Sequence, residues 1–254
     1  MNCTPRRRSK HLSCLSRWQS SSPSIILEAA HRKQPIFVKA SNLNTKTIHT
    51  ESASLETIEN GSFVRSAGRL WQEGTRAKFL DAIRDGTLPT EAFERWLVQD
   101  YLFAKGLTTF QAIAAGKAPR SAQKVLIDGL VAMEAELQWF EKLASEHSLD
   151  LKTPHHPICQ RYVDYLIASA YTKPPAIHLA ILFGVEAAYL SGWSRLEASG
   201  PYEEYIRRWS NDLFSQYVAE LHQACVDHPL KGQQDEFNTV LCHERDFWTM
   251  TYEG

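Results

Sequence analysis

The chain has 254 residues, of which 43% are hydrophobic and 22% charged, and its formal net charge is −1. This composition is typical of a globular protein with a sizeable core, and the balanced charge gives no indication of a nucleic-acid or membrane-surface partner. The five cysteines never form a CxxC pair, which argues against a disulfide scaffold or a zinc site and suits a reducing compartment. We expect a soluble protein, because no apolar stretch approaches the ~18 residues of a membrane span.

The first 61 residues differ in composition from the rest. Residues 1–50 contain nine Lys or Arg and a single acid, Glu28. An Arg-rich, Ser-rich and acid-poor segment without a continuous apolar core is typical of an organelle transit peptide. A disordered tail, or upstream sequence wrongly included in the reading frame, is the alternative. We therefore expect residues 1–61 to be a disordered extension and linker. A transit peptide would place the protein in the chloroplast or mitochondrion; otherwise it is cytoplasmic.

Apolar residues recur at helical spacing from Ser62 to the end of the chain. The expected helices cover residues 63–85, 90–115, 120–146, a segment after Pro157, 176–193, 202–227 and 233–252. No segment alternates apolar and polar residues convincingly as a strand does. The predicted fold class is therefore all-α, with residues 62–254 forming a single-domain helical bundle.

Three of these helices place an acid on an apolar face. Asp100 lies in the stripe of the second helix, Glu186 is the sole acid of residues 176–193, and Glu244 occupies a core-facing position near the C-terminus. A structural pairing explains one such acid well, because a buried carboxylate is costly unless it is paired. Three together, with many large aromatic residues, favour a shared small-molecule pocket. Apolar walls raise the pKa of a carboxyl group, which suits proton transfer.

Other chemistries fit this sequence less well. The sole Glu-x-x-His is Glu28–His31 in the extension, so a helical di-iron site is not expected. His178 stands alone on an apolar helix, as a core histidine does, and no GxSxG, GxGxxG or P-loop motif occurs. We predict neither a metal nor a cofactor. Three further acids fall off the stripe of the helix over 120–146 and are expected to face solvent: Glu134, Glu136 and Glu141.

Four blocks in order resemble the TenA/thiaminase II family: RWLVQDYLFAKGL (95–107), ILFGVEAAY (181–189), RRWSNDLFSQY (207–217) and HERDFWTM (243–250). The resemblance extends from Phe63 to Tyr252. It implies the helical heme-oxygenase-like fold, a homo-oligomer (dimer or tetramer) and salvage of the pyrimidine half of degraded thiamin.

The resemblance also implies residue roles. Asp100 matches the family's substrate-binding aspartate, Glu244 its acidic catalytic residue, and Phe103 an aromatic residue that stacks on the pyrimidine. Tyr162 and Trp209 match tyrosines that line the pocket in cysteine-type members. All five positions are therefore expected at one site.

One position departs from the cysteine-type members, because their nucleophilic cysteine falls on Gly184. The surrounding block is instead similar to the glutamate-type (TenA-E) branch, which shifts the expected catalytic role toward Glu186. We expect Glu186 and Glu244 to share general acid–base work, and Tyr162 and Tyr189 to orient them. The remaining cysteines of the helical region are not expected to replace the nucleophile: Cys159, Cys225 and Cys242.

For the glutamate-type branch, the resemblance implies hydrolysis of 5-aminomethyl-4-amino-2-methylpyrimidine and its N-formyl form. The products would be the hydroxymethyl pyrimidine with ammonia or formate. A non-catalytic pyrimidine-binding or regulatory protein on the same fold is the alternative, although no basic recognition helix is present. An oxygenase on this fold would require a haem or metal ligand set that the sequence does not offer.

Overall fold

The computed structural model describes residues 55–254, all of them within one compact unit. The predicted transit peptide and most of the predicted linker lie outside the described residues. Helix α1 (Leu55–Glu59) precedes the expected domain start at residue 62, and its Ile58 is 2% exposed. The packed helices therefore include residues before position 62, because this short helix buries an apolar side chain and packs against α8 (Pro175–Ser194).

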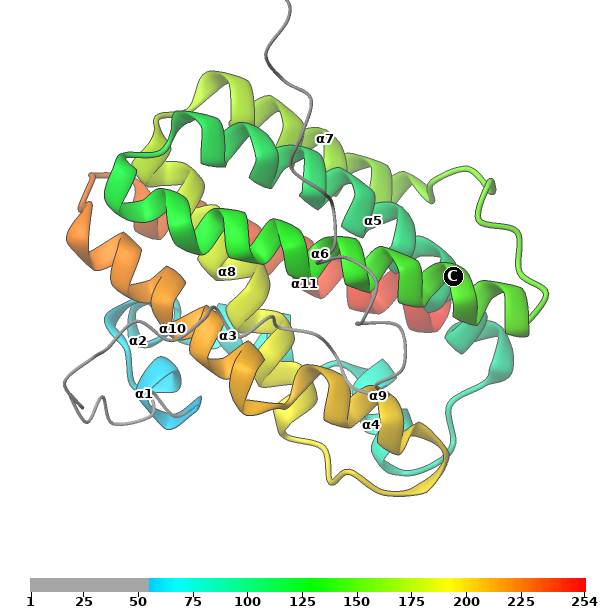
Figure 1. Ribbon diagram of the computed structural model, residues 1–254. Helices are drawn as coiled ribbons and strands as arrows, with labels where there is room; N and C mark the ends of the chain where they lie inside the picture. The colour runs from blue at the N-terminus through cyan, green and yellow to red at the C-terminus, as the bar shows by residue number, and fades with distance from the viewer. Residues whose placement is uncertain (1–54) are drawn as a thin grey trace, which may run out of the picture. The chain divides into compact units, whose positions relative to one another are not determined.

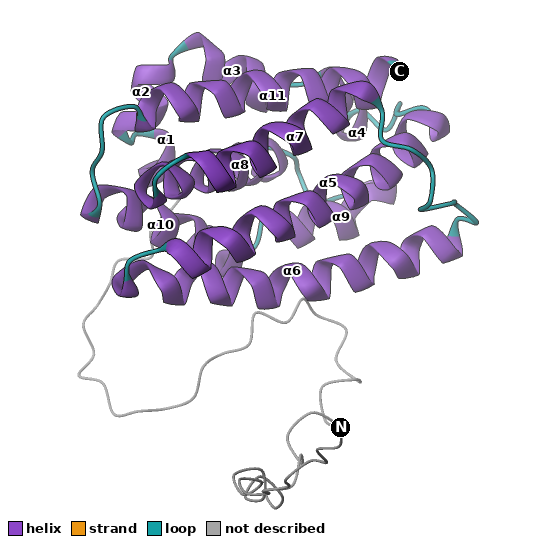
Figure 2. Cartoon of the chain, turned by 90° about the horizontal axis from the view of Figure 1, so that it is seen from above, coloured by secondary structure: helices purple, strands orange, loops and turns teal. Residues whose placement is uncertain are grey.

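The described residues form helices joined by short loops, with no strand among them (Figures 1 and 2). The predicted helices over 90–115, 120–146 and 233–252 are confirmed. The long helices are α5 (Thr90–Lys117), α6 (Arg120–Glu146), α7 (Pro157–Thr172), α8, α10 (Asp212–Asp227) and α11 (Gln233–Glu253). The short ones are α1, α2 (Ser62–Ala67), α3 (Arg69–Thr75), α4 (Lys78–Arg84), the 3₁₀ helix η1 (Gly200–Tyr202) and α9 (Glu203–Trp209).

Proline and polar side chains set the beginnings of several helices. Pro89, Pro119 and Pro174 directly precede α5, α6 and α8 with extended backbone, and the N–H that proline lacks has no intrahelical acceptor at this place. His156 caps α7 by accepting a 3.2 Å hydrogen bond from the Ile158 amide. Asn211 caps α10 in the same way, through a 2.9 Å bond from the Phe214 amide.

Two predicted helices are wrong as continuous elements. The segment over 63–85 is divided into α2, α3 and α4, because Gly68 adopts a φ of 55° and Ala77 is extended. The segment over 202–227 is divided between α9 and α10, because the chain leaves helical geometry at Asn211. The helical spacing of apolar residues continues across these breaks because the short helices also bury apolar faces. Helix α3, for example, packs along α11.

Helix α8 is the central helix of the described part and packs against α10, α11, α3, α5 and α9. By length and composition it could cross a membrane, with a mean hydropathy of 1.3, so the expectation that no apolar stretch reaches that length is wrong. However, 89% of that window is buried inside the protein, as in the core helix of a globular fold.

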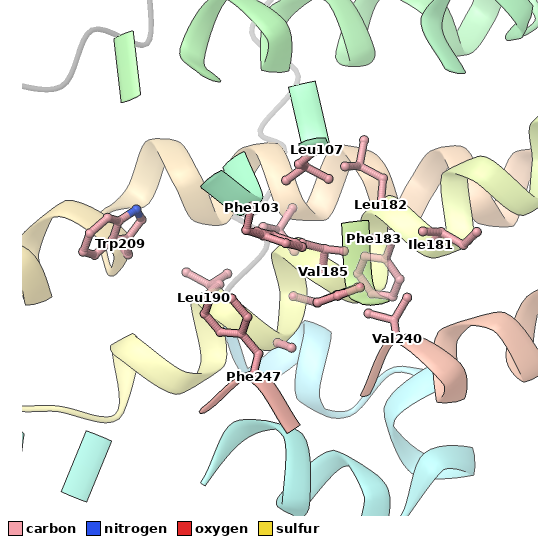
Figure 3. Close-up of a cluster of buried hydrophobic side chains, with 14 of the residues drawn as sticks. Phe103, Leu107, Ile181, Leu182, Phe183, Val185, Leu190, Trp209, Val240 and Phe247 are labelled. Carbon is pink, nitrogen blue, oxygen red and sulfur yellow. The ribbon is translucent and has the colours of Figure 1, made fainter. Parts of the chain in front are cut away.

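Apolar side chains of several helices meet around α8 (Figure 3). Phe183 of α8 stacks on Phe237 of α11 with ring centroids 5.5 Å apart, and Leu182 is fully buried. Burial of each side chain of this size stabilises the fold by about 1.5–3 kcal/mol. This packing fixes the position of α8 relative to α5 and α11, and therefore the positions of the acids that these helices carry.

Candidate active site

A cavity of ≈ 110 Å³ lies between α5, α6, α8, α9 and α10. Most of its wall is apolar, formed by side chains such as Phe103, Leu107, Val185 and Trp209 (Figure 3). A few polar side chains also reach it, as in small-molecule sites. These polar side chains are Asp100, Glu136, Glu186, Tyr189, Arg208 and Tyr217.

Asp100, on α5, is buried at the wall of this cavity. The Tyr189 hydroxyl, on α8, donates a 2.7 Å hydrogen bond to its Oδ2. Burial raises the pKa of Asp100 to about 7, the Tyr189 bond opposes this rise, and the negative charge of Glu136 adds to it. Asp100 can therefore exchange a proton near neutral pH.

Glu186, on α8, also lines the cavity and is 8% exposed. Burial raises its pKa to about 8, with further contributions from the charges of Glu136 and Asp100. No residue among 55–254 donates a hydrogen bond to its carboxyl group. This carboxyl is therefore free to contact a water molecule or a ligand in the cavity.

Glu244, on α11, lies beside the cavity but does not line it. The Tyr162 hydroxyl donates a 2.7 Å hydrogen bond to its Oε1, and the Tyr162 ring packs on Phe103 with centroids 4.6 Å apart. Burial raises the pKa of Glu244 to about 8, the bond from Tyr162 opposes this, and the charges of Asp100 and Glu186 add to it. The structure thus brings the three predicted acids together, with Glu244 and Tyr162 behind the wall.

Glu136 differs from its sequence prediction. It was expected to face solvent, but its side chain is only 19% exposed and lines the cavity. Its Oε2 accepts a 2.9 Å hydrogen bond from Arg208 Nε, and its Oε1 accepts one of 2.9 Å from Trp209 Nε1. The available signal was a second face of α6, on which Gly129, Ala132, Met133, Glu136 and Phe140 occupy positions i, i+3, i+4, i+7 and i+11.

Tyr217 is a second cavity residue that sequence reasoning missed. Gln111 Nε2 donates to its hydroxyl at 3.1 Å and to the Leu126 carbonyl at 2.9 Å. Gly129 makes room for this pair, because a Cβ there would lie 2.2 Å from Gln111 Nε2 and 2.3 Å from the Tyr217 hydroxyl. The need for a glycine at this position arises where α5, α6 and α10 pack together, so the sequence alone does not indicate it.

Gly184 faces away from the cavity. A Cβ at this position would lie 3.1 Å from Val240 Cγ1 and 3.3 Å from Phe237 Cδ2, both on α11. A side chain at position 184 would therefore enter the core between α8 and α11, and would not present a group to the cavity. The neighbouring residues Val185 and Glu186 line the cavity instead.

None of the three described cysteines lines the cavity. Burial raises the pKa of both the Cys159 and the Cys225 thiol to about 12, which makes a thiolate unfavourable. Over residues 55–254, no three His, Cys, Asp or Glu side chains are grouped to hold a metal ion. The polar groups available for chemistry at this site are therefore its carboxyls, hydroxyls and one guanidinium.

The fold and the site define an all-helical protein with a mostly apolar cavity and three buried carboxyls beside it. Residues 65–254 match the TENA/THI-4/PQQC family, and the chain belongs to this family. A TenA homologue of known structure from Pyrococcus furiosus is 26% identical, with a TM-score of 0.70, and the match covers 78% of this chain and all of that one. The predicted family and the all-α heme-oxygenase-like fold are thereby confirmed.

Two curated relatives have names that refer to function or branch. A probable bifunctional TENA-E protein of Glycine max is 27% identical over 201 residues, covering 72% of this chain and 88% of the relative. An aminopyrimidine aminohydrolase of Bacillus subtilis is 23% identical over 209 residues, covering 74% and 87%.

Proposed function

We propose that this chain is a hydrolase of thiamin salvage that acts on aminopyrimidines. Its substrates would be 5-aminomethyl-4-amino-2-methylpyrimidine, the N-formyl derivative of that amine, or both, and its final product the hydroxymethyl pyrimidine. The family match and the names of the soybean and Bacillus relatives support a hydrolase of this kind in general. The observation that carries the proposal is the pair of buried glutamates, Glu186 and Glu244, whose pKa values are both raised to about 8.

Asp100 is the group we assign to recognition of the pyrimidine. Tyr189 donates one hydrogen bond to Asp100 Oδ2, so Oδ1 and the second lone pair of Oδ2 remain available to the ligand. With a pKa of about 7, the carboxyl can share a proton with a ring nitrogen while accepting from the adjacent exocyclic amine. Phe103 and Trp209 line the same cavity and supply aromatic surfaces for the two ring faces. An analogue without the amino group would leave a buried polar group unsatisfied.

Glu186 and Glu244 are assigned the proton transfers. Glu186 lines the cavity and is assigned the role of base toward the attacking water. The proton that the departing amine takes up is assigned to Glu244, which lies behind the cavity wall and passes it on through one water molecule. Burial raises the pKa of both carboxyls, and the charges of Asp100 and Glu186 add a smaller rise to that of Glu244. With pKa values of about 8, both carboxyls exchange protons close to neutral pH, so an ionised Glu186 acts as the base and a protonated Glu244 as the acid.

The proposal is tested by measuring the release of ammonia and formate from the two pyrimidines. The assay compares the purified wild type with its Glu186→Gln and Glu244→Gln variants and with a control variant. Each glutamine removes a proton-transfer group and should lower kcat by about 10²-fold or more. Glu141→Gln, on the exposed side of α6 and away from the cavity, is the matched control and should retain wild-type turnover.

Near-wild-type turnover by both glutamine variants would refute the mechanism. Absence of turnover by the wild type, together with measurable binding of either pyrimidine in calorimetry, would instead favour the non-catalytic binding protein.

A further inference from the structure

Arg208 is the one cationic residue that lines the cavity in the described part of the chain. Its Nε and Nη2 atoms both bind Glu136 Oε2, at 2.9 and 2.8 Å. The two side chains are 13% and 19% exposed, so this ion pair is partly shielded from solvent. It connects α9 to α6 at the cavity wall.

The guanidinium is also held on a second side. Its Cζ lies 4.1 Å from the centroid of the Trp139 ring, as in a cation–π contact. Trp209, the next residue, donates from Nε1 to the other oxygen of Glu136. Arg208 is therefore positioned before any ligand binds, and little side-chain entropy remains to be lost on binding.

The two edges of the Arg208 guanidinium differ in their hydrogen-bond partners. Glu136 occupies the edge that carries Nε and Nη2, whereas no residue among 55–254 accepts a hydrogen bond from Nη1. An arginine carries five N–H donors and stays protonated at every physiological pH. The Nη1 donors therefore have no acceptor within the described residues and can bind one that a ligand supplies.

The other ionisable groups of the cavity wall carry no positive charge. Asp100, Glu136 and Glu186 are carboxyls, and the hydroxyl of Tyr189 is already donated to Asp100. A carbonyl oxygen, or the anion that forms from it, meets a fixed positive charge only at Arg208.

We propose that Arg208 is a specificity-determining residue that binds the carbonyl oxygen of an N-acyl substituent on the pyrimidine, and so favours the formylated substrate over the free amine. This proposal rests on the hydrolase function proposed above. In the acyl step the water oxygen bonds to the formyl carbon and the C–N bond breaks. A proton passes to the leaving nitrogen, so that formate and the free amine result. Arg208 stabilises the negative charge that collects on the carbonyl oxygen.

The experiment compares kcat/KM for the N-formyl and the free aminomethyl pyrimidine in the wild type and two variants. Arg208→Gln should lower the formyl-to-amine ratio of kcat/KM by about tenfold or more, the usual effect of losing a hydrogen bond to a charged group. Arg207→Gln is the matched control: this neighbouring arginine pairs with Glu203 on the surface and is 66% exposed, so the ratio should not change.

Two outcomes would overturn the inference. If Arg208→Gln lowers both kcat/KM values by the same factor, Arg208 acts only through the packing of α9 on α6. If it retains the wild-type ratio and rates, the guanidinium does not contact the acyl group. A wild type that hydrolyses neither pyrimidine would refute the proposed function itself, which is a different result from an active enzyme with an unchanged ratio.

Discussion

The hydroxyl of Tyr189 on α8 lies 2.7 Å from Asp100 Oδ2 on α5, and this hydrogen bond joins two helices at the cavity wall. It stabilises the ionised form of Asp100 and so opposes the effect of burial on the pKa of that carboxyl. The bond also leaves one carboxyl oxygen to the ligand. Tyr189 therefore links the geometry of the pocket to the protonation state of its recognition group.

Tyr189→Phe should weaken pyrimidine recognition. Without the hydroxyl, the pKa of Asp100 rises above its value of about 7 and its Oδ2 loses a partner. We expect KM to rise by roughly tenfold, as for loss of a hydrogen bond to a charged group. Tyr165→Phe removes a comparable bond to Glu236 outside the cavity and is the control. Equal KM values for the two variants in steady-state kinetics would contradict the role of Tyr189.

Glu186→Gln should stabilise the protein at alkaline pH. The pKa of Glu186 rises from 4.5 to about 8 on folding, so the folded state holds a proton that the unfolded chain releases. The free energy of unfolding therefore falls as pH rises from about 4.5 to 8. The neutral amide of glutamine removes this loss of stability. At pH 9 we expect the free energy of unfolding of the variant to exceed that of the wild type by roughly 1–3 kcal/mol, and near pH 4 we expect no such difference.

Urea unfolding at the two pH values measures this difference, with Glu141→Gln as the control for an exposed glutamate. The same stability difference at pH 4 and pH 9 would show that Glu186 does not gain a proton on folding.

Gly129→Ala should destabilise the protein and reduce turnover. The added Cβ would lie 2.2 Å from Gln111 Nε2 and 2.3 Å from the Tyr217 hydroxyl, so both side chains must move. We expect a loss of about 1–3 kcal/mol, the usual cost of overpacking. Gly116→Ala, on α5 with nothing within 4 Å of its Cβ, should instead stabilise by about 0.5–1 kcal/mol. Thermal unfolding of both variants tests the contrast, and a neutral Gly129→Ala would refute it.

A cysteine introduced at position 185, rather than at 184, should be accessible from the cavity. Val185 lines the cavity, whereas a side chain at Gly184 would press on Val240 and Phe237. Iodoacetamide should therefore label Val185→Cys under native conditions, and an aminopyrimidine should protect it. Gly184→Cys should react only after unfolding. Peptide mapping distinguishes the new cysteine from the native ones, and faster labelling at position 184 would reverse our assignment of these positions.

Much of the fold could be predicted because helical periodicity is local. The bounds of α6 follow from its apolar spacing and from Pro119, which directly precedes it. The break at Gly68 was missed because the apolar pattern continues through it, and the same holds at Asn211. At both places, short helices pack separately on the core, and a one-dimensional pattern does not distinguish this from one longer helix.

The amino-acid sequence by itself determined that Asp100, Glu186 and Glu244 lie on apolar helix faces, because each face is defined by residues within a few turns. Only the tertiary structure decided which side chains share the cavity. It placed Glu136 of α6 opposite Arg208 of α9 and turned Gly184 toward α11. These contacts are made by residues far apart in the chain. They depend on how whole helices pack against one another, which no local sequence pattern encodes.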